Sequence, residues 1–262
     1  MKINKLISII LAFALALCLC ACGGEEAEEG KTEIIVFAAA SMTETLTELG
    51  NKYMAEKENV NIVFNFDSSG TLKTQIQEGA DADIFISAGV KQMDELDSVL
   101  EDSRFNILEN KIALVVPDGN GAGIGSFDEL ADALKEGKIM LAMGNSDVPA
   151  GQYTQKILAY YGLDEESLAA DGLITYSSNV KEIASQIKEE AVDCGVIYET
   201  DAFSAGLAVA ATATAEMCGQ VIYPAAVINS SENAEEAKAF LAYLISDEAD
   251  AVFSNVGFTP IA

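Results

Sequence analysis

The chain has 262 residues, of which 15 are lysine or arginine, 42 are aspartate or glutamate, and none is histidine or tryptophan. The formal charge of −27 argues against nucleic acid as a partner, because binding to backbone phosphates needs a basic face. The lack of histidine excludes Ser-His-Asp and Cys-His catalysis and most catalytic zinc sites, whereas Ser-Lys and carboxylate chemistry stay open.

The N-terminal segment is predicted to be a secretion signal that ends in a lipid-modified cysteine. Two lysines precede the apolar residues 6–21, a stretch of 16 that is short for a membrane-spanning helix, which needs about 20. It fits a signal peptide over residues 1–21, and its end, LCACG, looks like a bacterial lipoprotein box with cleavage before Cys22 and a lipid on that sulfur. Residues 22–32 then form the lipidated cysteine and a flexible acidic tether. An uncleaved membrane anchor is the alternative.

The rest of the chain alternates strand and helix patterns. Helical spacing of apolar side chains occurs around Leu46, around Ile183 and over residues 233–247. This rhythm predicts an α/β fold with mostly parallel sheets flanked by helices. Short β-branched runs bounded by Gly, Asp or Asn predict buried strands at residues 34–39, 60–66, 83–88, 111–117, 138–144, 173–177, 194–199 and 220–228.

Four turns from strand to helix share one chemistry. Ligands of α/β sheets bind beyond the carboxyl ends of strands, where such turns lie. Each turn offers free backbone N–H groups and none carries a positive side chain, so together they could hold an anion, although each alone is explained as a helix cap. The turns are residues 38–44 with an S-x-x-E capping box at Ser41 and Glu44, 67–71 before a helix at 71–78, 148–151 with Pro149 at the first helical position, and 177–180 with Asn179 as N-cap.

The chain resembles the periplasmic molybdate-binding protein (ModA) family of ABC importers, from about residue 33 to its end. The pieces VPAGxY, VIYxTDA and GFTP are fairly specific to that family. The resemblance is carried, in this order, by FAAASMTETL, FNFDSSGTLKTQI, ADADIFISAG, NSDVPAGQYTQKIL, GVIYETDA and NVGFTPI.

The resemblance implies a two-lobed periplasmic-binding-protein fold of type II that closes on a ligand between its lobes. Residues 33–112 and 222–262 would form lobe I, and residues 113–221 lobe II. It further implies a monomeric extracytoplasmic lipoprotein, without enzymatic activity or cofactor, anchored at the outer face of the cell membrane. Such a protein captures molybdate, and tungstate with it, and delivers it to an ABC permease and its cytoplasmic ATPase.

Matched position by position, the family's binding residues are Ser41, Ser69, Ala150, Val180 and Tyr198. The serines would give a hydroxyl and a backbone N–H each, Ala150 and Val180 a backbone N–H, and Tyr198 its phenol. They would bind molybdenum only as its oxyanion, without direct metal coordination. Such a set suits a fully deprotonated dianion, which accepts hydrogen bonds and donates none.

Asp67 departs from the family pattern, which more often has a small residue there. A carboxylate at the site would oppose a dianion, or would accept a proton from a ligand such as hydrogen phosphate. The preferred interpretation is that Asp67 caps the helix at 71–78 with its side chain turned away. Cys194 and Cys218 are either a disulfide pair or two small buried hydrophobic residues.

Three other functions compete with this interpretation. The same fold could bind sulfate, phosphate or a small organic anion. A Ser-Lys hydrolase is disfavoured because Lys73 follows Ser69 by four residues, on the wrong side of a turn to act as a near base. An adhesin or structural lipoprotein would not explain the four turns that offer free backbone N–H groups, nor the position of Tyr198.

Overall fold

The computed structural model describes residues 30–262 of the chain. The predicted signal peptide, the lipidation of Cys22 and most of the predicted tether lie outside the described residues. Within the described part, no helix is long and apolar enough to cross a membrane.

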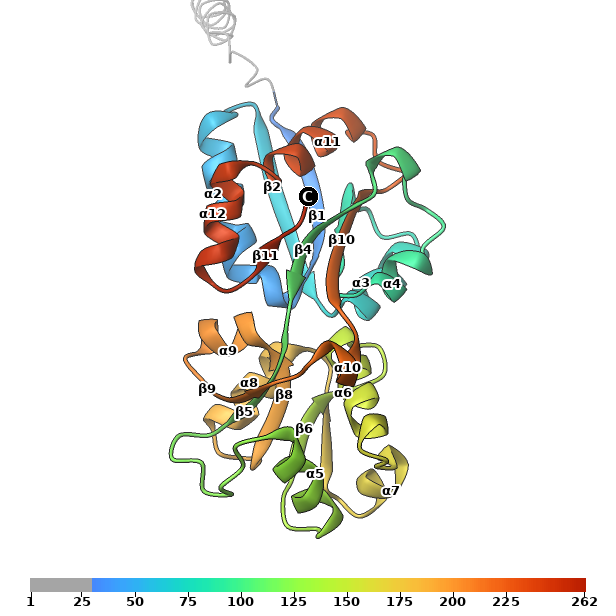
Figure 1. The fold of residues 1–262 in the computed structure, drawn as a ribbon. Coiled ribbons are helices and arrows are strands. Elements are labelled where there is room, and N and C mark those ends of the chain that lie inside the picture. The colour runs from blue at the N-terminus through green and yellow to red at the C-terminus, as the bar shows by residue number, and fades with distance from the viewer. Residues whose placement is uncertain (1–29) are drawn as a thin grey trace, which may run out of the picture.

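The first lobe, drawn at the top of Figure 1, is built on a six-stranded sheet. Its strands are β1 (Thr32–Ala39), β2 (Val60–Asp67), β3 (Ile84–Ile86), β4 (Phe105–Asn110), β10 (Val221–Val227) and β11 (Thr259–Pro260). They lie in the order β11-β4-β10-β3-β1-β2. β1 runs parallel to β2 and β3, whereas β10 runs antiparallel to β3 and β4.

The second lobe is built on a five-stranded sheet in the order β7-β6-β8-β5-β9. Its strands are β5 (Ile112–Val116), β6 (Leu141–Gly144), β7 (Ile174–Ser177), β8 (Cys194–Tyr198) and β9 (Ala208–Thr212). β6 is parallel to β7 and β8, and β5 is antiparallel to β8 and β9. The two predicted α/β lobes are thus confirmed. Their sheets were predicted to be mostly parallel and instead mix both strand directions, because β10, β4 and β11 in the first sheet and β5 and β9 in the second pair antiparallel.

Helices cover the sheets of both lobes, and their apolar faces explain why they form. In α8, the side chains of Val180, Ile183, Ala184 and Ile187 are buried on one face, as their spacing predicts. The first lobe holds the 3-10 turns η1 (Ala40–Met42) and η2 (Glu101–Ser103), with α2 (Thr43–Glu56), α3 (Ser69–Gln77), α4 (Val90–Asp94), α11 (Ala234–Tyr243) and α12 (Asp247–Asn255). The second holds α5 (Phe127–Lys135), α6 (Pro149–Tyr160), α7 (Glu165–Ala170), α8 (Val180–Lys188), α9 (Glu199–Ala205) and α10 (Ala215–Cys218).

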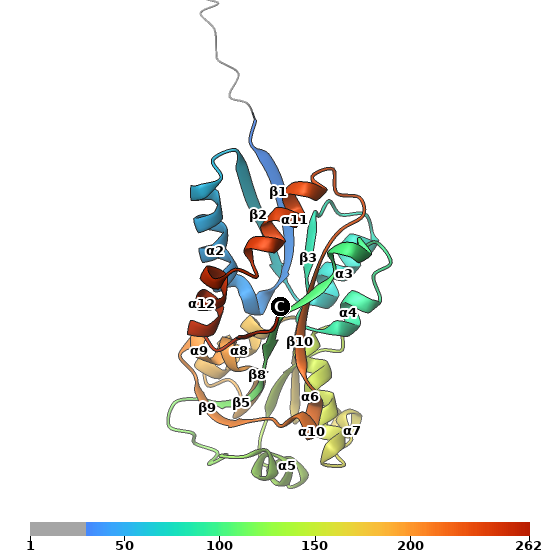
Figure 2. The same ribbon diagram turned by 45° about the horizontal axis from the view of Figure 1, so that its top comes forward.

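Two segments join the lobes, one from β4 to β5 and one from α10 to β10 (Figure 1). They run side by side, because Asn110 at the end of β4 pairs with Val221 at the start of β10. Figure 2 shows α3 and α4 of the first lobe on the same side of the molecule as α6 of the second. Two adjacent connections of this kind are the arrangement in which hinge motions between lobes occur.

Cys194 and Cys218 are both buried and form no disulfide with each other. Cys194 begins β8 and Cys218 ends α10. Of the two interpretations of this pair, the structure matches the one of small buried hydrophobic side chains.

Candidate ligand-binding site

A small cavity of about 10 Å³ lies between the lobes, where four of the five predicted binding residues converge. We call it the interlobe cavity. Ala150 is the fifth, and it lies one residue beyond Pro149 on α6. The cavity is lined by Ala39, Ala40, Ser41, Asp67, Ser68, Ser69, Ala88, Val148, Pro149, Asn179, Val180 and Tyr198. No lysine or arginine is among these lining residues.

Ser41 lies in η1, directly after the parallel strand β1, and its side chain is buried. Its Oγ is 2.9 Å from the phenol oxygen of Tyr223. The predicted capping box with Glu44 does not form, because α2 begins at Thr43 without any side-chain cap. The hydroxyl of Ser41 is therefore not used at the helix end and remains at the cavity.

Ser69 is the first residue of α3, two residues earlier than the predicted helix start. Its Oγ accepts a hydrogen bond from the backbone N–H of Ala88 at 2.9 Å, and only 1% of the residue is exposed. The first N–H groups of a helix have no partner within it, so this turn presents amide donors beside the hydroxyl.

The preferred interpretation of Asp67 as a helix cap is wrong. Ser68 caps α3, since its Oγ accepts a hydrogen bond from the N–H of Thr71 at 3.1 Å. Asp67 ends β2, and its Oδ1 accepts from the N–H of Ser68 at 2.7 Å. Asp67 is also one of the residues that line the interlobe cavity, so an acidic residue stands at the candidate site.

The second lobe brings the N-termini of α6 and α8 to the same cavity. Pro149 is the first residue of α6, as predicted, and Ala150 follows it fully buried. Asn179 caps α8, as predicted, because its Oδ1 accepts from the N–H groups of Lys181 and Glu182 at 3.0 and 3.1 Å. Val180 therefore stands at a capped helix start whose remaining amides can meet a ligand.

Tyr198 comes from the end of β8 and reaches across to the first lobe. Its phenol donates a hydrogen bond to the carbonyl oxygen of Ala88 at 3.2 Å. Burial raises its pKa well above the ordinary value, so the phenol keeps its hydrogen at neutral pH. In this arrangement the hydroxyl hydrogen of Tyr198 is used by the carbonyl of Ala88 in the other lobe. The hydroxyl therefore has to rotate away from that carbonyl before it can donate to a ligand.

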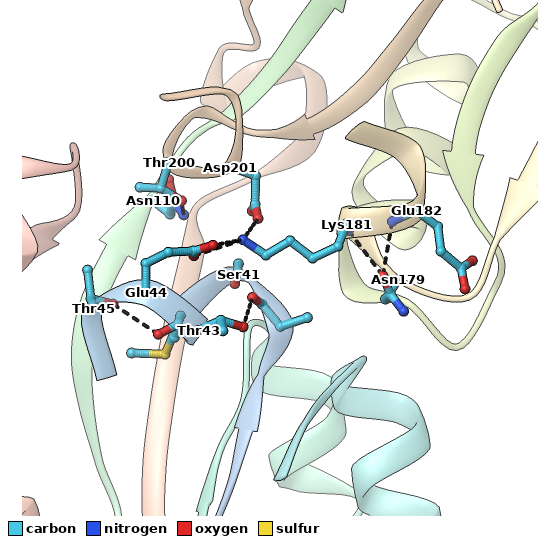
Figure 3. A network of polar contacts seen from close by, with 12 residues as sticks. Ser41, Thr43, Glu44, Thr45, Asn110, Asn179, Lys181, Glu182, Thr200 and Asp201 are labelled. Atoms are coloured by element: carbon cyan, nitrogen blue, oxygen red, sulfur yellow. Dashed lines mark hydrogen bonds and ion pairs between the residues drawn. The ribbon is translucent and has the colours of Figure 1, made fainter. Parts of the chain in front are cut away.

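An ion pair beside the cavity also joins the lobes (Figure 3). The ammonium of Lys181 on α8 lies 2.8 Å from the carboxylate of Glu44 on α2 and 3.4 Å from that of Asp201 on α9. Burial raises the pKa of Asp201 to about 7, and Lys181 lowers it in part. Sequence reasoning missed this group, because a lysine after a helix cap gives no sign of partners far along the chain.

A larger groove of about 500 Å³ runs beside α4 and α6. Gln92, Lys91 and Lys156 contribute to its lining, together with Gly89 and Pro149. It contains none of the five predicted binding residues. The interlobe cavity is the stronger candidate, because hydroxyls and helix N-termini from both lobes meet there.

Comparison with known proteins places the chain in a family. A model described as bacterial extracellular solute-binding protein matches residues 34–259. YvgL of Bacillus subtilis (strain 168), provisionally named an ABC transporter substrate-binding lipoprotein, is 34% identical over 264 residues, or 98% of each chain. The molybdate-binding protein ModA of Escherichia coli (strain K12) is 34% identical over 248 residues, which cover 90% of this chain and 92% of ModA.

Among solved structures, the periplasmic molybdate-binding protein of Azotobacter vinelandii shares the fold with a TM-score of 0.74. It is 22% identical and covers 87% of this chain and 100% of its own. The chain belongs to the family of bacterial extracellular solute-binding proteins. It is a ModA-like member of that family, and the predicted resemblance is confirmed together with the type II two-lobed fold.

Proposed function

We propose that this protein captures molybdate, and tungstate with it, outside the cell and delivers it to the permease and cytoplasmic ATPase of an ABC importer. In this proposal Ser41, Ser69, Ala150, Val180 and Tyr198 bind the oxyanion. A lipid on Cys22 holds the protein at the outer face of the cell membrane. The names of the E. coli and A. vinelandii relatives support the ligand, and that of YvgL supports the lipid anchor.

The observation that carries the proposal is the composition of the interlobe cavity. Two serine hydroxyls and the N-termini of α3, α6 and α8 converge there from both lobes, without a lysine or arginine among the lining residues. Neutral donors can hold a dianion without a buried positive charge that would itself need a partner. Hydrogen bonds to a charged group are each worth roughly 1.5–3 kcal/mol, so a handful supports tight binding.

The overall charge of −27 does not prevent anion capture. Its repulsion is screened within about 8–10 Å at ordinary ionic strength, so the local dipoles decide the affinity.

Another oxyanion is the alternative ligand, and Asp67 is the observation that favours it. The Oδ1 of Asp67 is used by the N–H of Ser68, which leaves its other oxygen to accept a hydrogen bond in the cavity. Hydrogen phosphate carries such a hydrogen, whereas molybdate and sulfate at neutral pH do not.

A binding role is favoured over a Ser-Lys hydrolase. The ammonium of Lys73 lies 2.5 Å from the carboxylate of Glu95, which directly follows α4. It is therefore occupied elsewhere and not held as a base beside Ser69.

Calorimetry on the full chain, purified in mild detergent, tests the proposal with molybdate, tungstate, sulfate and phosphate titrated separately. We expect tight binding of molybdate and tungstate only. Ser69→Ala should weaken it by at least about 10-fold, the worth of one charge-assisted bond. Ser98→Ala, which alters another buried hydroxyl away from the cavity, should not. Heat with phosphate alone would establish the alternative, and no heat with any of the four would refute oxyanion binding.

A further inference from the structure

The hydroxyl of Ser41 contacts a buried phenol behind the interlobe cavity. Its Oγ lies 2.9 Å from the phenol oxygen of Tyr223, which comes from β10 and is fully buried. Since both groups can donate and accept, this contact alone leaves the direction of donation open. The direction matters because it decides whether Ser41 offers a ligand its hydrogen or a lone pair.

Asn110, at the end of β4, decides the direction. Its Oδ1 accepts a hydrogen bond from the N–H of Lys111 at 2.8 Å, which assigns its amide nitrogen to the opposite side. That nitrogen donates to Oγ1 of Thr200 at 2.9 Å and to the phenol oxygen of Tyr223 at 3.1 Å. Because an amide nitrogen only donates, the phenol oxygen must accept from it. Figure 3 shows Asn110 and Thr200 close to each other near Ser41.

Two hydroxyls of the described residues lie near the phenol of Tyr223, those of Ser41 and Tyr198. Only that of Ser41 is hydrogen-bonded to it, at 2.9 Å, whereas the phenol of Tyr198 donates to the carbonyl oxygen of Ala88. A buried O–H left without an acceptor is costly, so the phenol donates to the Oγ of Ser41. The lone pair that faces the phenol is thereby used, and the hydroxyl hydrogen of Ser41 is left to point into the cavity.

Ser69 is arranged in the same way by a different partner. Its Oγ accepts from the N–H of Ala88, so its own hydrogen is also free to donate. Both hydroxyls at the cavity are therefore set as donors by groups behind them. Asp67 is the one acidic side chain among the described residues that line the cavity.

We propose that Asn110 and Tyr223 are positioning residues that direct the hydroxyl hydrogen of Ser41 into the interlobe cavity, so that the site favours oxyanions without a proton over oxyanions that carry one. The inference rests on the proposed function, because it requires an oxyanion in the cavity. A fully deprotonated oxyanion only accepts hydrogen bonds, whereas hydrogen phosphate also has to donate. A serine whose lone pair accepts from a phenol can donate to the deprotonated oxyanion, but it cannot accept the hydrogen of hydrogen phosphate with that lone pair.

Asn110 has a second role besides its hydrogen bond to Tyr223. It ends β4 where the chain passes between the lobes, and its amide also holds Thr200 of the second lobe. The same side chain thus links a residue of the second lobe to the orientation of the Ser41 hydroxyl.

Calorimetry with sodium molybdate and inorganic phosphate at pH 7, on the full chain in mild detergent, tests the inference. Tyr223→Phe keeps the ring and removes the donor behind Ser41. We expect it to lower molybdate affinity by about 5- to 10-fold, part of the worth of one charge-assisted bond, and to narrow the preference for molybdate over phosphate. Tyr243→Phe, which removes another phenol of the first lobe that has no protein partner, should change neither.

A double-mutant cycle separates positioning from a structural effect. If Tyr223 acts through Ser41, then Tyr223→Phe has no further effect on affinity in a Ser41→Ala background. Asn110→Ala should give a smaller loss of the same kind, also abolished by Ser41→Ala, and it serves as the second route if the first variant fails to fold by circular dichroism. If the losses of molybdate affinity are additive in the cycle, or if the preference for molybdate over phosphate is unchanged, the inference is overturned while the proposed function stands. A wild-type chain that binds no oxyanion would overturn the proposed function with it.

Discussion

The buried carboxylate of Asp201 should make the folded protein less stable as the pH rises from about 4 to about 7. Its pKa is raised from 3.8 to about 7, chiefly because burial disfavours the charged form, and Lys181 offsets only part of this. Since the folded-state pKa lies above the unfolded value, the folded protein holds this proton more tightly. The resulting stability is complete below about pH 3.8 and is lost as the pH rises through about 7. At about 1.4 kcal/mol for each pKa unit, the full loss is roughly 4 kcal/mol.

The Asp201→Asn variant removes this titration while keeping the shape of the side chain. Urea unfolding of the variant and the wild type at pH 5 and pH 8 gives the free energy of unfolding of each. Most of the 4 kcal/mol falls in that interval, so the stability of the variant relative to wild type should increase by roughly 2–3 kcal/mol from pH 5 to pH 8. Asp97→Asn, at an exposed position, should show no such change. A difference between variant and wild type that is equal at both pH values would refute the reasoning.

Two further predictions concern the contact between the lobes and a buried thiol. A Cβ added at Gly70 would lie 2.0 Å from the carbonyl oxygen of Asp147 across the lobes, so Gly70→Ala should hinder closure and lower molybdate affinity by at least about 10-fold. Calorimetry and the radius of gyration from X-ray scattering check this, and an unchanged affinity would contradict it. Burial raises the pKa of Cys194 to about 12, so iodoacetamide at pH 8 should label it only after unfolding in urea. Mass spectrometry of its peptide decides, and equal labelling in native buffer would contradict the prediction.

The sequence predicted the strands whose residue types match their environment and missed the others. β1 and β8 are β-branched and buried, and both were found. β9 is mostly alanine, which has little preference for strands, and β4 contains polar residues that carry no strand signal. β11 has two residues, Thr259 and Pro260, which form a strand only because β4 offers them a partner.

The candidate site was predictable where it depends on local backbone and not where it depends on distant partners. Pro149 and Asn179 act within one helical turn, so their roles at helix starts could be inferred from neighbouring residues. The capping box at Ser41 and Glu44 was predicted from the same kind of pattern and was wrong. Lys181, which is 137 residues away in sequence, holds the Glu44 carboxylate instead.

The hydrogen bonds that orient the Ser41 hydroxyl could not be predicted either, because they too join residues far apart in the sequence. Asn110 and Tyr223 contact each other across 113 residues, and Tyr223 contacts Ser41 across 182. Nothing in the spacing of these residues marks them as partners, because the register that joins β4 to β10 is set by the whole sheet.

The place of β10 in the first sheet has a consequence for the order in which the chain can fold. β10 lies between β3 and β4, although 110 and more residues separate it in sequence from both. The strands of the second sheet, by contrast, follow one another without interruption from Ile112 to Thr212. A growing chain can therefore complete the second sheet first. The edge of β3 stays unpaired until β10 is synthesised, near the end of the chain. A chain cut short before Val221 should keep its second lobe and lose its first, although the first lobe contains most of the residues made earliest.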